Sequence, residues 1–80
     1  MVTPESIRTS IAEGLRCEHR EVRGDGRHWE AVIVSPAFEG LSKIRQHQLV
    51  YAALGDRMRE EIHALSMTTL TPEQWAKARG

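Results

Sequence analysis

The sequence has little of several features that would point directly to a function. Its single cysteine, Cys17, excludes an internal disulfide, and nothing suggests secretion. Lys+Arg and Asp+Glu balance at 11 each, whereas proteins that bind nucleic acid mainly through phosphates usually carry a basic excess. No apolar run approaches the roughly 20 residues that span a bilayer, and the start, MVTPESIRTS, has no signal-peptide pattern. We therefore expect a cytoplasmic protein with no membrane partner.

The usual signatures of an enzyme are also missing. P-loop and dinucleotide-binding fingerprints are absent. Asp25, His28 and His63 could form an acid–base set, but no nucleophile with an orienting partner accompanies them. A chain of 80 residues also leaves little room for a substrate pocket. The sequence therefore predicts that the protein is not an enzyme.

What is present suits one small globular domain over residues 1–80. Charged residues make up 28% and apolar residues 40% of the chain, as in ordinary soluble domains. A chain of this length buries only about 60–65% of its unfolded surface, so the core must be modest. We expect a single domain without internal repeats.

The first half of the chain predicts a helix followed by a hairpin. Thr3 is placed to cap a helix whose first residue is Pro4. An apolar stripe with helical spacing follows, formed by Ile7, Ile11 and Leu15. Residues 17–22 fit an edge strand. The turn at 24–26, Gly-Asp-Gly, then leads into a stronger strand over 29–34, so that the two strands form a hairpin.

The second half predicts a long helix, a strand and a short helix. Ser42 is placed to cap the long helix, and Gly55 marks a kink or a break in it. Residues 64–70 alternate as in a strand. Thr71 caps the closing helix over 72–79, which Trp75 anchors. The expected apolar stripe of the long helix comprises Ile44, His47, Tyr51, Leu54, Met58 and Ile62.

The resulting order, α-β-β-α-β-α, predicts an α+β fold. A helical crossover between the second and third strands makes these two parallel, while the hairpin is antiparallel. We therefore expect a three-stranded mixed sheet with helices packed on it.

Six short strings occur in order over roughly residues 4–79. They are GDGRHW at 24–29, IVS at 33–35, FEGLS at 38–42, HQLVY at 47–51, IHALS at 62–66 and TPEQW at 71–75. Together, and at this spacing, they resemble the BolA family in its IbaG-like bacterial branch. The resemblance implies a BolA-like α-β-β-α-β fold related to class II KH domains.

The resemblance also implies a partner and a cofactor. BolA-like proteins bind monothiol glutaredoxins, and the pair shares a [2Fe-2S] cluster. The family supplies one ligand from the loop between the first two strands and one from the I-H-A-L segment, which are His28 and His63 here. A glutaredoxin cysteine and a glutathione thiol complete the set. The isolated chain is then expected to hold no cluster and to be a monomer or a weak homodimer.

The chemistry of the chain agrees with a shared cluster. Such a cluster needs four ligands, usually thiolates, and this chain has one cysteine and four histidines. Two imidazoles with two thiolates would resemble a Rieske-type arrangement, which raises the reduction potential. Because imidazole is protonated near neutral pH, the site should loosen as the pH falls toward about 6.

Each histidine also has a structural interpretation. His28 fits a solvated residue beside a turn, and His63 fits a cation at a helix C-terminus. We expect His47 to be partly buried with a hydrogen-bond partner and His19 to face solvent. Cys17 fits a small apolar residue at a strand start. Because neighbours on a strand point to opposite faces, Trp29 should point inward and His28 outward.

Nucleic-acid binding, as a transcriptional regulator of the BolA type, is the alternative function. The chain lacks the G-x-x-G loop with which KH domains grip the backbone. Its basic residues alternate with acids, as in RMREE at 57–61, which is typical of a solvated face. The adaptor function predicts only weak, salt-sensitive DNA binding. The basic residues that the alternative would use are Lys43, Arg45, Arg57, Arg59, Lys77 and Arg79.

Overall fold

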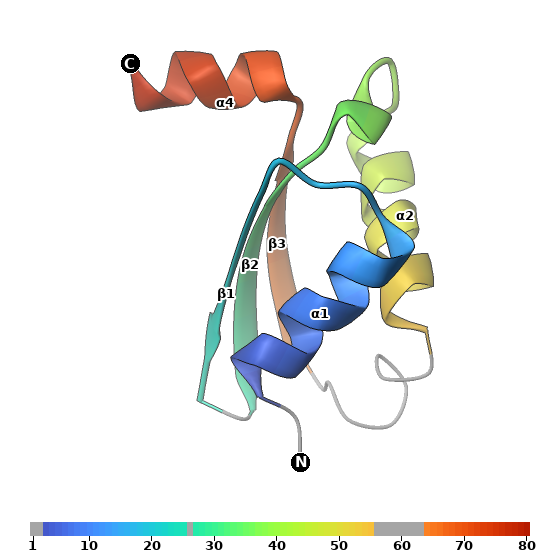
Figure 1. Ribbon diagram of the computed structural model, residues 1–80, viewed down its shortest axis with the longest axis vertical. Helices are drawn as coiled ribbons and strands as arrows, with labels where there is room; N and C mark the ends of the chain where they lie inside the picture. The colour runs from blue at the N-terminus through green and yellow to red at the C-terminus, as the bar shows by residue number, and fades with distance from the viewer. Residues whose placement is uncertain (1–2, 26, 56–63) are drawn as a thin grey trace.

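The computed structural model describes residues 3–25, 27–55 and 64–80, and it has the predicted element order (Figure 1). The predicted α+β class, with helices on a three-stranded sheet, is confirmed. The elements are helix α1 (Pro4–Gly14), strands β1 (His19–Gly24) and β2 (His28–Val34), the 3-10 turn η1 (Pro36–Phe38), helix α2 (Lys43–Leu54), strand β3 (Ala64–Leu70) and helix α4 (Pro72–Arg79).

The sheet is mixed, with β2 at its centre. β1 pairs antiparallel with β2, and β3 pairs parallel with β2, as predicted. Trp29 lies opposite Gly24 on one side and Leu65 on the other. β1 begins later than the sequence suggested, at His19, so Cys17 lies in the connection before the strand.

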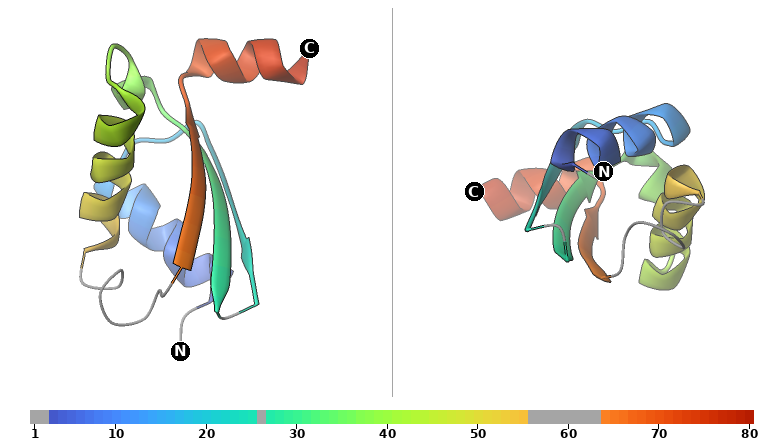
Figure 2. Two further views of the ribbon diagram at one scale, coloured as in Figure 1. Left: turned by 180° about the vertical axis from the view of Figure 1, so that it is seen from behind. Right: turned by 90° about the horizontal axis from the view of Figure 1, so that it is seen from below.

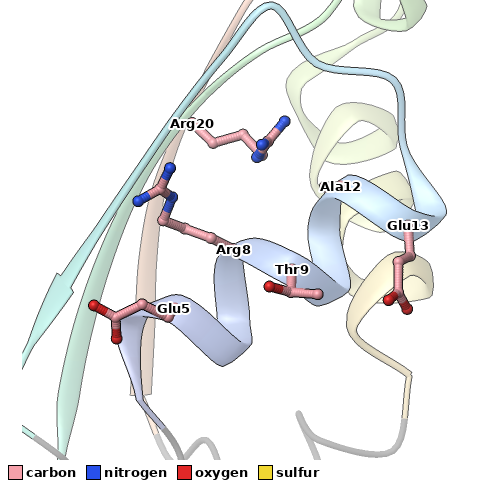
Figure 3. A pocket seen from close by; sticks show the side chains of 6 residues that line it. All are labelled: Glu5, Arg8, Thr9, Ala12, Glu13 and Arg20. Atoms are coloured by element: carbon pink, nitrogen blue, oxygen red, sulfur yellow. The ribbon is translucent and has the colours of Figure 1, made fainter.

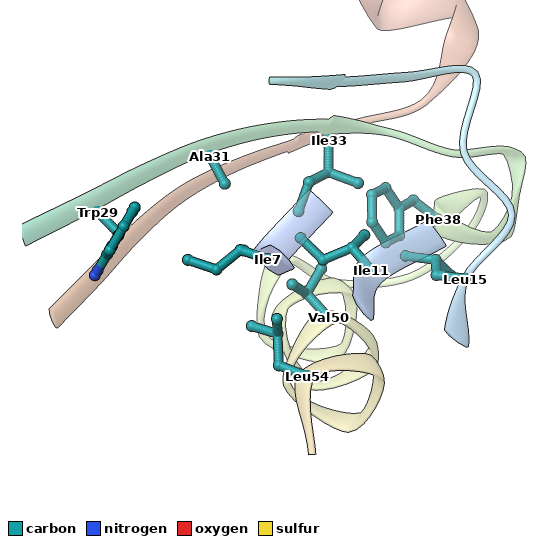
Figure 4. Packing of buried hydrophobic residues seen from close by; sticks show 9 residues of the cluster. All are labelled: Ile7, Ile11, Leu15, Trp29, Ala31, Ile33, Phe38, Val50 and Leu54. Carbon is teal, nitrogen blue, oxygen red and sulfur yellow. The ribbon is translucent and has the colours of Figure 1, made fainter. Parts of the chain in front are cut away.

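Helices α1 and α2 cover one face of the sheet and leave the other face open (Figures 1 and 2). The core lies between these layers (Figure 4). The two helices approach closely at Gly14, where an added Cβ would lie 2.7 Å from the Ala53 Cβ. Both predicted N-caps, Thr3 and Thr71, form, and each is part of a capping box. The buried core residues are Ile7, Ile11, Leu15, Trp29, Ala31, Ile33, Phe38, Val50 and Leu54.

The predicted apolar stripe of α2 is wrong at two of its positions. Ile44 is 72% exposed and Tyr51 is 40% exposed, whereas Gln46 is buried together with Val50. The Gln46 amide donates to the carbonyl oxygens of Phe38 (3.2 Å) and Leu41 (3.0 Å). Because these bonds satisfy a polar side chain in the core, the helix turns a different face inward. Met58 and Ile62 lie outside the described residues.

Gly55 ends α2 with a φ of 59°, so it marks a break in the helix and not a kink. Helix α4 lies at one end of the sheet, away from α1 (Figures 1 and 2). The indole of Trp75 stacks on the His19 ring, with ring centroids 4.6 Å apart, and Arg79 lies over the indole. Trp75 is thus the predicted anchor. His19, expected to face solvent, is half-buried because the returning helix covers it.

Candidate functional site

His28 is the first residue of β2 and sits directly after the hairpin turn. Its backbone is fixed, because its N–H donates to Asp25 Oδ1 at 2.9 Å and its carbonyl accepts from the Asp25 N–H at 3.2 Å. Its side chain is exposed, and its imidazole makes no hydrogen bond or ion pair with any described residue. The turn therefore holds the His28 backbone in place while leaving the ring available.

Asp25 organises this turn with its carboxylate. The Oδ1 atom accepts from the backbone N–H groups of both His28 and Arg27, each at 2.9 Å. These bonds favour the charged form, so they lower the pKa of the Asp25 carboxyl, with the His28 N–H as the largest cause. Aspartate is common in turns because its side chain bonds the backbone a few residues on.

Trp29 fixes the strand on the opposite face, as the alternation predicted. It is buried, with 2% of its surface exposed. A Cβ atom on Gly24 would collide with the Trp29 ring and with the His28 carbonyl oxygen. Gly24 therefore leaves room for the Trp29 ring beside β1. Because Trp29 points into the core, its neighbour His28 points to the opposite face of the sheet.

A shallow hollow of about 290 Å³ surrounds the exposed side of His28. Arg23 and Glu30 line it, together with Gly24 and Asp25. Arg23 and Glu30 were not among the site residues predicted from the sequence. The signal that could have found them is the two-residue period of the strands, which places residues 28 and 30 on one face.

His63 lies outside the described residues, so its predicted place beside His28 stays a prediction. One described contact bears on it. Ala64, the residue after position 63, is the Cα partner of His28 in the β2–β3 pairing. Within the described ranges, no group of three or more His, Cys, Asp or Glu residues is arranged to hold a metal ion.

The other candidate ligands are engaged in the fold or stand apart. Cys17 is half-buried and packs against the core, and its thiol donates to the Leu15 carbonyl oxygen at 3.3 Å. Burial raises the pKa of this thiol, and the nearby Arg20 opposes the effect only in part. His47 is half-buried on α2, as predicted, but no hydrogen bond of its side chain occurs within the described part.

Some of the basic residues that nucleic-acid binding would use already interact with other groups of the chain. The Lys43 ammonium donates to the Thr69 carbonyl oxygen. Lys77 pairs with Glu73 at 3.4 Å, and Arg79 lies over the Trp75 ring. Arg57 and Arg59 lie outside the described residues. Within the ranges that the figures show in colour, no helix is long and apolar enough to cross a membrane.

A family match covers most of the chain. Residues 4–74 match the family described as BolA-like protein. The human "BolA-like protein 1" is 38% identical over 80 residues, which cover 88% of this chain and 58% of that protein. The "Acid stress protein IbaG" of Escherichia coli is 32% identical over 74 residues, covering 91% of this chain and 88% of that one. This chain thus spans less than two thirds of the human relative.

Two further comparisons agree. The "DNA-binding transcriptional regulator BolA" of Haemophilus influenzae is 39% identical over 57 residues, which cover 71% of this chain and 55% of that protein. The solved structure of a bolA protein homologue from Coxiella burnetii matches with a TM-score of 0.82 at 44% identity, covering 95% of this chain and 99% of that chain. None of these names describes an enzyme. The chain belongs to the BolA family.

Proposed function

We propose that the protein is a non-catalytic adaptor that binds a monothiol glutaredoxin and shares a [2Fe-2S] cluster with it. The observation that carries the proposal is the state of His28. Its backbone is fixed by Asp25, and its exposed imidazole has no partner among the described residues. Because the backbone at this position is already held in place, only the side chain loses conformational freedom when it binds a ligand.

The donor set fits a shared cluster better than a resident one. His28 supplies one nitrogen, and His63 is the second ligand that the family resemblance implies. His28 is the Cα partner of Ala64 in the β2–β3 pairing, and His63 directly precedes Ala64 in the sequence. The half-buried Cys17, with its raised pKa, is a poor thiolate donor. The two remaining ligands would come from the glutaredoxin cysteine and glutathione.

Within such a complex, residues of this chain would bind the cluster and orient the ligand side chains. Asp25 holds the His28 backbone through the turn, and Trp29 anchors the strand behind it. The bound cluster supplies one-electron redox chemistry, whose potential imidazole ligands raise relative to thiolates. The role in the cell would be iron–sulfur trafficking or a response to iron or stress.

The test is co-expression with a monothiol glutaredoxin in the presence of glutathione. We expect a coloured complex whose visible absorption and circular dichroism spectra differ from those of the glutaredoxin homodimer. His63→Ala should abolish that difference and His28→Ala should weaken it, while His47→Ala serves as the matched control. Spectra that are unchanged in both ligand variants would exclude these residues as ligands.

Transcriptional regulation is the second candidate, because one relative is named a DNA-binding transcriptional regulator. Against it stand the balanced charge and the engagement of Lys43 and Lys77 within the chain. A gel-shift titration at about 0.15 M salt should show only weak, salt-sensitive binding if the adaptor function holds. Tight, sequence-selective binding would reverse the order of the two candidates.

A further inference from the structure

The outer edge of β1 presents backbone groups that bond nothing within the sheet. β1 pairs only with β2. Because the Asp25 N–H donates to the His28 carbonyl, every second residue back from Asp25 directs its N–H and C=O toward β2. The residues between them, Arg20, Val22 and Gly24, therefore direct theirs away from the sheet.

This edge lacks two common protections against pairing with another strand. It contains no proline over His19–Gly24. In Figures 1 and 2 the helices α1 and α2 cross one face of the sheet and leave the outer side of β1 uncovered, except at its His19 end, where α4 returns. What the edge does carry is charge of both signs, since Glu21 and Arg23 are both exposed. A strand that pairs with this edge must therefore match charges of both signs.

The β1 sequence is complementary to itself in one antiparallel register. In a pairing centred on Val22, each of the three outward-directed residues faces another outward-directed residue: Val22 faces its own copy and Arg20 faces Gly24. Glu21 then faces Arg23 of the second copy, twice, in the non-hydrogen-bonded positions where side chains are closest. Shifting the centre by one residue would oppose Glu21 to Glu21, or Arg23 to Arg23, and lose this match.

A hollow beside this edge has the same balanced charge. It measures about 400 Å³ and lies between α1 and β1 (Figure 3). No ion pair joins its side chains within the described part, and Arg20 Nε is buried without a hydrogen-bond partner. Its two acidic and two basic side chains are therefore not committed to ion pairs with one another. Its lining residues are Glu5, Arg8, Thr9, Ala12, Glu13 and Arg20.

We infer that β1 is a self-association edge, on which β1 of a second copy pairs antiparallel with Val22 at the two-fold axis. The two sheets then join into one continuous sheet. The axis is perpendicular to the sheet, so both α1 helices lie on the same face and bring their charged hollows to the same side. Every contact is reciprocal, as a two-fold interface requires. A single strand pair is a small interface, so the dimer forms only at high concentration.

The most direct test compares neighbouring amides of β1 by hydrogen exchange over a concentration series of the full chain. The Arg20, Val22 and Gly24 amides should exchange progressively more slowly as concentration rises. The Glu21 and Arg23 amides, which face β2, should already be protected and should change little, so they are internal controls. Exchange at all five that is independent of concentration up to about 1 mM would overturn the inference.

Charge reversal tests the register and the choice of partner. Glu21→Arg and Arg23→Glu each place like charges opposite one another, so each variant alone should sediment as a monomer where the wild type associates. Mixed in equal amounts, the two variants should associate again. In the mixed dimer, positions 21 and 23 are both positive in the Glu21→Arg chain and both negative in the Arg23→Glu chain, so opposite charges face each other at both contacts. Glu39→Arg, in an exposed loop, is the control and should leave association unchanged.

Two results would contradict the self-pairing. One is a mixture that stays monomeric while each variant retains the circular dichroism of the wild type. The other is a wild type that stays monomeric at every concentration, which would leave the edge to a strand of another protein. If a variant fails to fold, the amide comparison on the wild type still decides. The inference does not depend on cluster binding, so its failure would leave the adaptor function untouched.

Discussion

Polar side chains occur at both ends of the paired strands β2 and β3, but the protein uses them in different ways. At the end near α4, Gln46 and Thr69 are buried and bond each other, with Thr69 Oγ1 donating to Gln46 Oε1 at 2.7 Å. At the other end, Asp25 and His28 are exposed, and the His28 ring bonds no described residue. The polar groups of the buried end bond within the fold, whereas the open end leaves the His28 imidazole unbonded in the described part of the chain.

The buried end extends beyond this pair. Ser35 is fully buried, and its hydroxyl donates to the Arg16 carbonyl and accepts from the Ala37 N–H. The Lys43 ammonium closes the edge of β3 by donating to the Thr69 carbonyl. Because buried polar groups are costly when unpaired, these residues are tied to the stability of the fold. Exposed residues whose side chains are unpaired are better candidates for function.

The largest effect should come from Gln46→Leu. The change removes the amide donor from the Phe38 and Leu41 carbonyl oxygens, of which Phe38 keeps the Leu41 N–H. It also leaves the Thr69 hydroxyl without its acceptor, so the free energy of unfolding should fall by about 2–3 kcal/mol. Gln48→Leu, exposed on the same helix, should stay within about 0.5 kcal/mol of the wild type. Urea unfolding measures both. Equal stability of the two variants would contradict the claim that the buried polar groups stabilise the fold.

Thr69→Val should have a smaller effect. It keeps the shape of the side chain and removes the hydroxyl that bonds Gln46, which should cost about 1 kcal/mol. Thr68→Val, on the exposed face of the same strand, is the matched control and should change little. If Thr68→Val lowers the thermal or urea transition more than Thr69→Val does, then Thr69 is not the buried residue of the pair, contrary to the structure.

His28→Ala should leave stability within about 0.5 kcal/mol of the wild type. The hydrogen bonds at position 28 are made by the backbone and survive the substitution. Urea unfolding of the isolated chain is the measurement. A loss much above 1 kcal/mol would mean that the imidazole supports the fold, which is the property of the buried end.

Asp25→Ala should have a local effect only. The Arg27 and His28 amides lose their acceptor and should exchange faster with solvent, while Asp25→Asn retains an oxygen acceptor and should show less change. The folded pKa of Asp25 lies below its ordinary value. Its stabilisation is therefore present above about pH 4 and lost as the pH falls through the folded pKa. A His28 amide signal that titrates at the ordinary pKa would contradict this role.

The sequence was sufficient for the order of elements because local signals set it. The caps at Thr3 and Thr71 and the alternation of His28 and Trp29 need no distant partner. The inward face of α2 could not be predicted in this way. Gln46 is buried because carbonyls of a preceding loop and a hydroxyl on β3, 23 residues away, satisfy it, and apolar periodicity does not detect such partners.

The candidate site also has features that the local sequence determines and features that depend on distant residues. His28 could be placed because a turn and a strand start determine its position locally. The burial of His19 could not, because it depends on Trp75, which the chain brings back from 56 positions later to stack on the ring. Pairing of His28 with a second ligand is also a long-range property, and the family resemblance alone named His63.

The most direct test of the central claim is a count of nitrogen ligands on the cluster shared with glutaredoxin. Pulsed electron paramagnetic resonance of the reduced complex, with this chain labelled with ¹⁵N-histidine, reports imidazole nitrogens bound to iron. We predict couplings from two histidines of this chain in the wild type. One of them should disappear in His28→Ala, and both should persist in His47→Ala. A wild-type spectrum without histidine couplings, or one unchanged in His28→Ala, would contradict the claim.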